Sequence, residues 1–538
     1  MNVEKMIKRD ISVEIANYLT NNLPCYEKKN IDDEKTYETN FLHLMNVIGK
    51  NVINIPRKVH YSRELIKKMN KEFPKELCDL IKLFEKKFDK GESVKGYLSK
   101  KDIEVVPEFD EKNVEYGKVI NYKMSLFRKA FKNFKENKNY LGFCEKNAFW
   151  LYDYSLFMSL KNYFIEQRKN TYESAEYKAY YSANEKKVKL NAIKDCFYGG
   201  AWNSFPEDIR DKKPEAVEKY TKLLKTEIDF YKFLQYEFFT QWQELKEYAN
   251  EKEIEIIGDI PIFVAEDSAD VWSNRNLFSL DTKGFPKVVA GVPPDYFSAD
   301  GQLWGNPLYD WKEHSKTGYD WWTKRIENAF KLCDIVRIDH FRGFESYWEI
   351  PFGEKTAVNG KWKKGPKEEI FNVMENKLGK LNIIAEDLGD LTDEVFDLRD
   401  ELGFPGMKIL QFAFDSDEAN AYLPFNYETT NCVVYTGTHD NDTTKGWYSK
   451  ADKKATDYVR RLLNVSGEDI AWDLIRMAEG SVAKYAVIPV QDVMNLGSKA
   501  RMNTPGKAED NWQFRFTEDM LTDDMAKGMK YLAKIYNR

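Results

Sequence analysis

Short apolar runs alternate with helix-like stretches through the second half of the sequence, and this alternation constrains the fold more than any other feature. Each run is rich in β-branched residues, is bounded by Gly, Asp or Pro, and is separated from the next by a stretch of helical periodicity. That arrangement is typical of βα units built around a parallel sheet. The predicted strands are 253–261, 334–339, 382–386, 407–412, 432–436 and 485–490.

We therefore predict an α/β protein based on a TIM-type (β/α)8 barrel with helical inserted subdomains. Residues 241–538 would form the main part of the barrel. Residues 96–240 form a predicted helical subdomain, because apolar positions recur there at three- and four-residue steps, and the polar stretch 165–197 is an insertion in it. Residues 1–95 are a divergent N-terminal region with one clear strand pattern, at 51–55, so the first two barrel strands stay uncertain.

The composition is that of a globular chain without a general affinity for nucleic acid. Hydrophobic residues make up 42% of the sequence and aromatic residues 15%, which excludes a disordered chain. The net charge of −6 provides no basic field for nucleic acid. No apolar run approaches the roughly 18 residues of a membrane span, and the N-terminus lacks the apolar core of a signal peptide. We expect a cytoplasmic protein with no membrane or nucleic-acid partner.

Acidic residues follow three of the predicted strands and point to glycoside chemistry. Asp339, Glu386 and Asp440 are far apart in the sequence, so they converge only if the barrel folds. Neighbouring carboxylates repel, which raises the pKa of at least one and supplies a protonated acid beside an ionised nucleophile. A retaining glycosidase needs such a pair about 5 to 5.5 Å apart. Arg337 would keep Asp339 ionised, and His439 would bond a sugar hydroxyl.

Four longer segments make the sequence recognisable. They are GDIPIFVA at 258–265, DSADVW at 267–272, GVPPDYFSADGQLWGNP at 291–307 and ARMNTPG at 500–506. With these segments, the chain from about residue 96 to its end resembles the 4-α-glucanotransferases (amylomaltases or disproportionating enzymes), relatives of the α-amylases. The resemblance makes 291–307 a substrate loop and implies maltooligosaccharides and α-1,4-glucans as substrates. It also implies transfer of glucan segments by a retaining double displacement, which needs no cofactor and no metal.

The resemblance also assigns roles to individual residues. It implies that Asp339 is the nucleophile, that Glu386 is the general acid/base, and that Asp440 binds the distorted sugar. The implied substrate-binding residues are Arg337, His439, Asp259, Gln302, Trp304, Asn503 and an aromatic loop of Tyr296 and Phe297.

Several of these residues have a second, purely structural interpretation. Asp259 could cap the turn after its strand, Tyr296 and Phe297 could pack within their own loop, and Asn503 could serve the Asn-Thr-Pro-Gly turn. Two other functions also remain open: a glucan-binding inactive relative, and an α-amylase-like hydrolase. The expected oligomeric state is a monomer or a homodimer.

Overall fold

The computed structural model describes residues 96–538 except 174–200, 295–297, 390 and 508. The chain divides into two compact units, Met1–Ser99 and Lys100–Arg538, and the second contains nearly all of the described residues. The strand expected at 51–55, most of the insertion expected at 165–197, and both Tyr296 and Phe297 lie outside the described residues.

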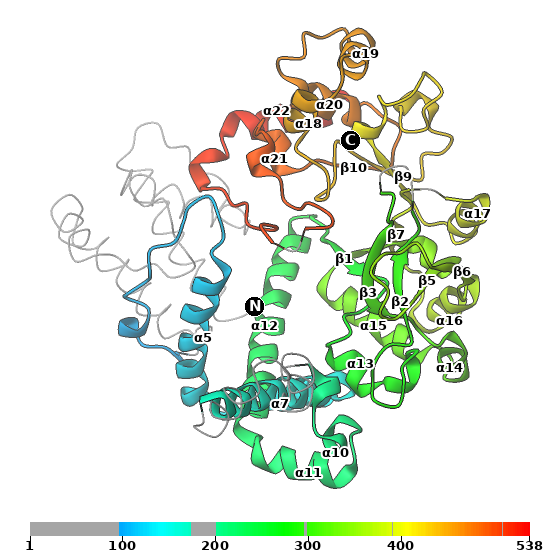
Figure 1. Cartoon of the computed structure of the whole chain (residues 1–538). Coiled ribbons are helices and arrows are strands. Elements are labelled where there is room, and N and C mark those ends of the chain that lie inside the picture. The colour runs from blue at the N-terminus through cyan, green and yellow to red at the C-terminus, as the bar shows by residue number, and fades with distance from the viewer. Residues whose placement is uncertain (1–95, 174–200, 295–297, 390, 508) are drawn as a thin grey trace, which may run out of the picture. The chain divides into compact units, whose positions relative to one another are not determined.

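Two groups of parallel strands form the centre of the second unit (Figure 1). The first has the order β1-β4-β7, with β1 at Ile257–Pro261, β4 at Ile335–Asp339 and β7 at Ile383–Ala385. The second has the order β10-β9-β8, with β8 at Gly406–Ile409, β9 at Cys432–Tyr435 and β10 at Tyr485–Val487. All six predicted strands are present, and they pair in parallel as predicted. Their predicted bounds are too wide: β1 begins at Ile257, Leu410–Phe412 forms a 3-10 helix, and Val490 begins a helix.

A backbone hydrogen bond connects the two groups. The Ala385 amide of β7 donates to the carbonyl of Pro405, just before β8, over 3.0 Å. Neighbours in space are thus consecutive in sequence from β1 to β10, once the antiparallel strands described below are set aside. That order is the one in which βα units follow one another around a parallel sheet.

Amphipathic helices precede the parallel strands and cover them. They are α15 (Asp320–Leu332) before β4, α16 (Glu368–Leu378) before β7 and α17 (Asp393–Glu401) before β8. The apolar side of α15 buries Trp322 and Ile326 completely in the main core, together with Val336 and Ile338 of β4. Burial of these large apolar side chains is the main force that holds helix and strand together. Between β9 and β10 lie α18 (Thr444–Lys450), α19 (Lys453–Leu463) and α20 (Ile470–Glu479).

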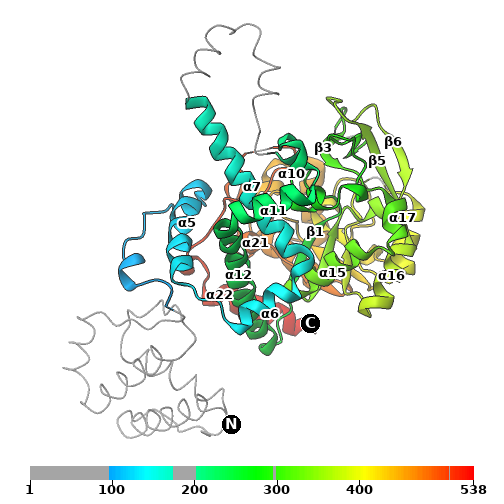
Figure 2. The same cartoon turned by 90° about the horizontal axis from the view of Figure 1, so that it is seen from below.

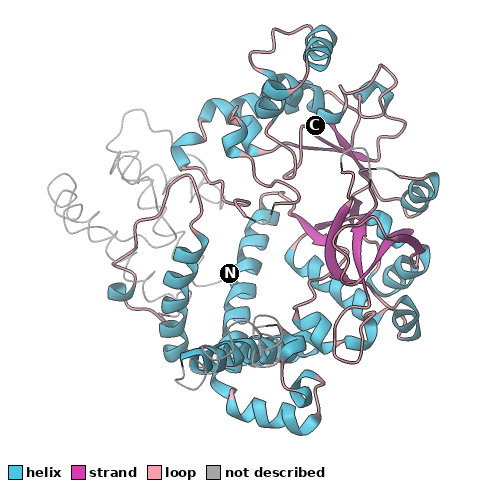
Figure 3. Cartoon of the chain, in the orientation of Figure 1, coloured by secondary structure: helices cyan, strands magenta, loops and turns pink. Residues whose placement is uncertain are grey.

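An antiparallel sheet, which the sequence patterns do not predict, lies beside the parallel strands (Figure 3). Its order is β3-β2-β5-β6, with β2 at Val288–Val292, β3 at Gln302–Pro307, β5 at Ser346–Pro351 and β6 at Lys361–Lys364. The expected substrate loop at 291–307 therefore ends in a strand. Gly305, at φ 82°, interrupts the regular alternation by which a strand would be identified from sequence.

A layer of long helices confirms the helical periodicity of the preceding segment (Figure 2). The helices include α5 (Tyr116–Asn133), α6 (Lys138–Lys146), α7 (Ala148–Glu173), α11 (Pro214–Leu223) and α12 (Lys225–Glu251). Phe131 of α5 packs on Phe230 and Phe233 of α12, with ring centroids 5.5 and 5.6 Å apart. Trp242 of α12 donates its indole N–H to the carbonyl of Leu332, over 2.6 Å, and so attaches this layer to α15. Within the described ranges, none of the helices has the length and apolar character needed to cross a bilayer.

Candidate active site

Arg337 lies at the centre of the predicted site and connects two strands. It is buried on β4, directly opposite Asp259 in the register of β1. Its Nη1 atom donates to both carboxylate oxygens of Asp259, each over 2.8 Å, and lies 3.0 Å from Oδ1 of Asp339. Asp259 is thus bonded to Arg337 rather than placed as a turn cap, and one guanidinium serves two carboxylates.

Asp339 ends β4 with its side chain 46% exposed, so its carboxylate is accessible to a ligand. Partial burial raises the pKa of this carboxyl above its ordinary value, and the Arg337 guanidinium opposes that rise. The charges of Asp259 and Asp440 add to the rise, which places both carboxylates within electrostatic reach of Asp339. The network therefore contains the like charges that the sequence predicts.

Glu386 follows β7 and lies beside Asp339, because β4 and β7 are adjacent and parallel. Its Oε2 accepts the backbone N–H of His340 over 2.7 Å, and its Oε1 accepts that of Leu388 over 3.1 Å. Burial raises the pKa of Glu386 from 4.5 to about 7; the Arg337 cation acts against this shift and the Asp339 charge adds to it. A carboxyl group that exchanges its proton near neutral pH is suited to general acid/base work.

His340 is a residue of this site that the sequence argument left without a role. It lies between Asp339 and the helical turn η4 (Phe341–Phe344), in the left-handed region at φ 57°. Burial lowers the pKa of its imidazole to about 3, and within the described structure its buried Nε2 has no hydrogen-bond partner. The ring is therefore neutral. Its signal in the sequence was only its place directly after the predicted nucleophile.

Gln302 and Trp304 reach this cluster from the antiparallel sheet. Both are on β3, and the indole N–H of Trp304 donates to Oε1 of Gln302 over 3.1 Å. The ring of Trp304 meets that of His340 edge to face, with centroids 4.8 Å apart. Trp304 remains 38% exposed. The two residues therefore lie beside the carboxyl cluster, where the indole can stack on a sugar ring.

Asp440 belongs to a second cluster, on the segment after β9. Its Oδ1 accepts the Asn503 side-chain N–H over 2.5 Å, and its Oδ2 lies 3.5 Å from Nε2 of His439. The Asn503 backbone N–H in turn donates to the carbonyl of His439 over 3.0 Å. Arg501, which the sequence argument did not select, donates to the carbonyl of Asp440 over 2.5 Å. Asn503 therefore orients Asp440, beyond any part it plays in its own turn.

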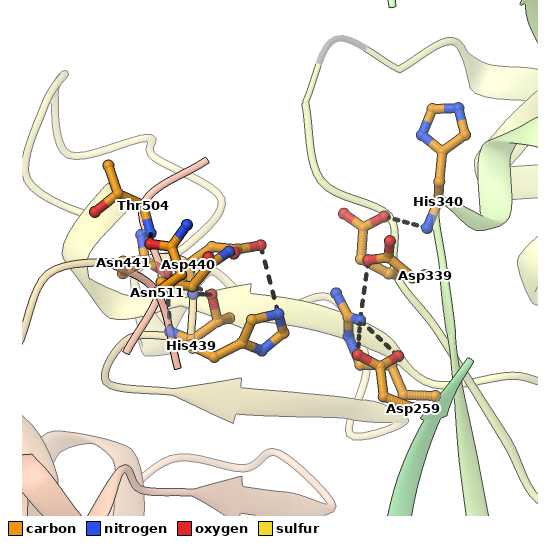
Figure 4. A network of polar contacts seen from close by, with 12 residues as sticks. Asp259, Asp339, His340, His439, Asp440, Asn441, Thr504 and Asn511 are labelled. Carbon is orange, nitrogen blue, oxygen red and sulfur yellow. Dashed lines mark hydrogen bonds and ion pairs between the residues drawn. The ribbon is translucent and has the colours of Figure 1, made fainter. Parts of the chain in front are cut away.

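Figure 4 shows the two clusters in one view, with His439 and Asp440 on one side and Asp259 and Asp339 on the other. A cavity of about 250 Å³ adjoins both of them and is lined by Arg337 from the first cluster and His439 from the second. Trp512, whose ring lies 5.2 Å from that of His439, also lines it. Every predicted site residue among the described ones thus belongs to one connected region. No group of three His, Cys, Asp or Glu in the described part of the chain is arranged to hold a metal ion.

Asp387, the residue after Glu386, positions the strand next to the site. It is buried, and its Oδ1 accepts the backbone N–H of Met407 over 2.7 Å while its Oδ2 lies 2.5 Å from Nη1 of Arg399. A side chain added at Gly406 would place its Cβ only 2.2 Å from Oδ2 of Asp387. The residue next to Glu386 thereby fixes β8 against the end of β7.

Comparison with known proteins identifies the family. The family model of the 4-alpha-glucanotransferases matches residues 77–191 and 166–522. The 4-alpha-glucanotransferase of Clostridium butyricum is 45% identical over 456 residues, which cover 82% of this chain and 86% of that protein. The enzyme of the same name from Thermus thermophilus is 42% identical over 458 residues, with coverage of 82% and 84%.

A solved structure agrees with these sequence matches. The amylomaltase of Streptococcus agalactiae, determined in complex with acarbose, superposes with a TM-score of 0.73 at 34% sequence identity. The superposition covers 82% of this chain and 84% of that one. The chain belongs to the 4-alpha-glucanotransferase family.

Proposed function

We propose that the protein transfers α-1,4-glucan segments between maltooligosaccharides by a retaining double displacement. The observation that carries the proposal is the pairing of two unlike carboxyl groups at the ends of adjacent strands. Arg337 contacts Asp339 over 3.0 Å, whereas burial raises the pKa of Glu386 to about 7. One carboxyl is thereby favoured as an anion and the other retains a proton near neutral pH, the division of labour that retaining transfer needs.

In the first step, the Asp339 carboxylate attacks the anomeric carbon of the donor glucan. Glu386 gives its proton to the glycosidic oxygen as that bond breaks, and the shortened glucan leaves. The product is a glucosyl ester of Asp339. Asp440, oriented by Asn503 and His439, would bind the sugar hydroxyls as the ring distorts towards the oxocarbenium-like transition state.

In the second step, Glu386 is ionised and acts as the base. It takes the proton from a hydroxyl of the acceptor glucan, whose oxygen attacks the anomeric carbon and releases Asp339. Two inversions give net retention. Gln302 and Trp304 support acceptor binding, because the exposed indole offers an apolar face beside the carboxyl cluster and the amide offers hydrogen bonds. The acarbose complex of the Streptococcus agalactiae amylomaltase supports an oligosaccharide ligand for this chain.

We also propose that the parallel strands belong to a TIM-type (β/α)8 barrel, with 96–240 as a helical subdomain and 241–538 as the main part of the barrel. The sequential order of the strands from β1 to β10 and the site at their carboxyl ends support this architecture. The amylomaltase of Corynebacterium glutamicum, 15% identical, shares the fold with a TM-score of 0.58.

The test is incubation of the purified protein with maltotriose, followed by chromatography of all products. We expect glucose together with a ladder of longer maltodextrins. The ladder should vanish in Asp339→Asn and persist in Asp524→Asn, a matched change at a 91% exposed carboxylate on α22 (Asp523–Ile535). Glucose and maltose alone would indicate a hydrolase, and no product from the folded protein would indicate an inactive glucan-binding relative.

A further inference from the structure

A second cavity, of about 420 Å³, lies away from the carboxyl clusters. It is bounded by the first turns of α7, by α13 (Ala269–Ser273) and the residues after it, and by α15. None of the residues that we assign to catalysis or to substrate binding lines it. Its chemistry therefore needs its own explanation.

Four aromatic side chains line this cavity. They belong to Phe149, Trp150, Tyr154 and Trp321. The protein already uses the polar atoms of two of them: Nε1 of Trp150 donates to Asn147 over 3.2 Å, and the Tyr154 hydroxyl accepts from Gln235 over 3.4 Å. Phe149 is 41% exposed. Cations already lie over two of the rings: Lys324 and Lys331 each lie 5.7 Å from the centre of the Phe149 ring, and Arg325 lies 5.4 Å from that of Trp321. The remaining ring surface is carbon, of the kind on which the apolar face of a pyranose stacks.

Polar groups complete the lining, which contains three acidic side chains, Asp153, Asp270 and Asp320, and two basic ones, Lys324 and Arg325. Asp153 is paired with Lys212 over 2.8 Å, and Asp320 with Lys324 over 2.6 Å. No cation is left in excess to attract an anion. Ser273 and Asn328 also line the cavity, and in the described structure the buried Ser273 Oγ and Asn328 Oδ1 have no hydrogen-bond partner. Buried polar atoms normally have partners, so these two retain unused bonding capacity at the cavity wall.

We infer that this cavity is a second carbohydrate site, which binds a short stretch of a neutral α-glucan through its aromatic side chains and its polar groups. The choice of an α-glucan over other sugars rests on the proposed function. Because both sites are on one protein molecule, binding of one end of a glucan in this cavity raises the effective concentration of its other end at the carboxyl clusters. Long glucans gain from this tethering, whereas maltotriose is too short to occupy both sites.

The test is calorimetric titration of maltotetraose into the full chain carrying Asp339→Asn, which stops turnover. Asn276→Trp adds bulk at an exposed residue of the cavity lining, and Ser273→Ala removes the unpartnered hydroxyl without adding volume. Tyr531→Ala removes a 60% exposed aromatic on α22 and is the control. We expect two binding events in the background variant and in the control, only one with Asn276→Trp, and about tenfold weaker binding at the second site with Ser273→Ala.

The outcomes separate this inference from the proposed function. A single binding event that Asn276→Trp abolishes supports the cavity and counts against the carboxyl site. Binding that Asn276→Trp and Ser273→Ala both leave unchanged, or no binding at all, overturns the inference. Binding of inorganic phosphate that Asn276→Trp abolishes overturns the assigned ligand class. In the otherwise native chain, Asn276→Trp should leave the rate of transfer from maltotriose unchanged. A loss of that transfer rate would overturn the separation of the two sites.

Discussion

The backbone N–H of His340 donates to Oε2 of Glu386 over 2.7 Å. His340 directly follows Asp339, so the residue next to the proposed nucleophile positions the proposed general acid/base. The bond depends on the left-handed conformation of His340, at φ 57°. Asparagine tolerates this conformation, whereas a β-branched side chain is strained in it. The geometry of Glu386 is therefore set by a backbone conformation rather than by a side-chain contact.

Two substitutions at this position should differ in stability. Asparagine in His340→Asn can adopt the left-handed backbone conformation without strain. His340→Val should therefore lower the free energy of unfolding by about 1 to 2 kcal/mol more than His340→Asn does. Urea unfolding followed by circular dichroism measures the difference. Equal loss in the two variants would show that the left-handed turn is not what the position requires.

The activity should depend on pH as a bell whose two sides come from the two carboxyl groups. Glu386 must hold its proton for the first step, so kcat/KM should fall as the pH rises through about 7. Asp339 must be ionised, so kcat/KM should also fall at acidic pH, through a pKa that burial raises above 3.8. Initial rates with maltotriose across the pH range measure both sides.

Arg337 supplies a matched test of these assignments. The guanidinium lowers the pKa of both carboxyls, so Arg337→Met should move both sides of the bell to higher pH. Arg337→Lys keeps a cation at the position and should move the profile less. The idea fails if the methionine variant, shown to be folded by its melting curve, retains the native profile.

Asn503 should affect the activity through its hydrogen bond to Asp440. Loss of the 2.5 Å bond in Asn503→Ala removes a partner of a charged group, which corresponds to about a tenfold to hundredfold loss of kcat/KM. Asn503→Asp should be worse still, because it sets a second carboxylate against the first. Asn382→Ala, at an exposed residue before β7 and at the far end of that strand from Glu386, serves as the control and should behave like the native chain.

Asp387→Ala should destabilise the protein more than any of these changes. It breaks a buried ion pair with Arg399 and leaves the Met407 N–H unsatisfied, which costs about 3 to 5 kcal/mol. Chemical denaturation measures the loss. The double variant with Arg399→Ala should recover part of it, because the guanidinium, whose other carboxylate partner is the exposed Asp400, is then removed together with its buried partner; a fully additive loss would contradict a coupled pair.

The sequence was sufficient for the parallel strands and for the carboxylates at their ends. Each strand falls in a short run rich in apolar residues, and the order of parallel βα units brings Asp339 and Glu386 together without any knowledge of side-chain packing. The antiparallel sheet was not predicted, because β2 pairs with β5 far along the chain and Gly305 hides the alternation of β3. His340 and Arg501 were missed for a related reason: one acts through its backbone, and the other reaches Asp440 only after folding.

The close approach of Gly406 to Asp387 also limits how this chain can change. The Asp387 carboxylate occupies the space in which a Cβ at residue 406 would lie. A larger residue at 406 is therefore unacceptable while the aspartate is present, and a smaller residue at 387 leaves the Arg399 guanidinium with the 61% exposed Asp400 as its counter-charge in place of a buried one. A single substitution at either residue therefore destabilises the protein, so random mutagenesis should recover substitutions at 387 and 406 together or not at all.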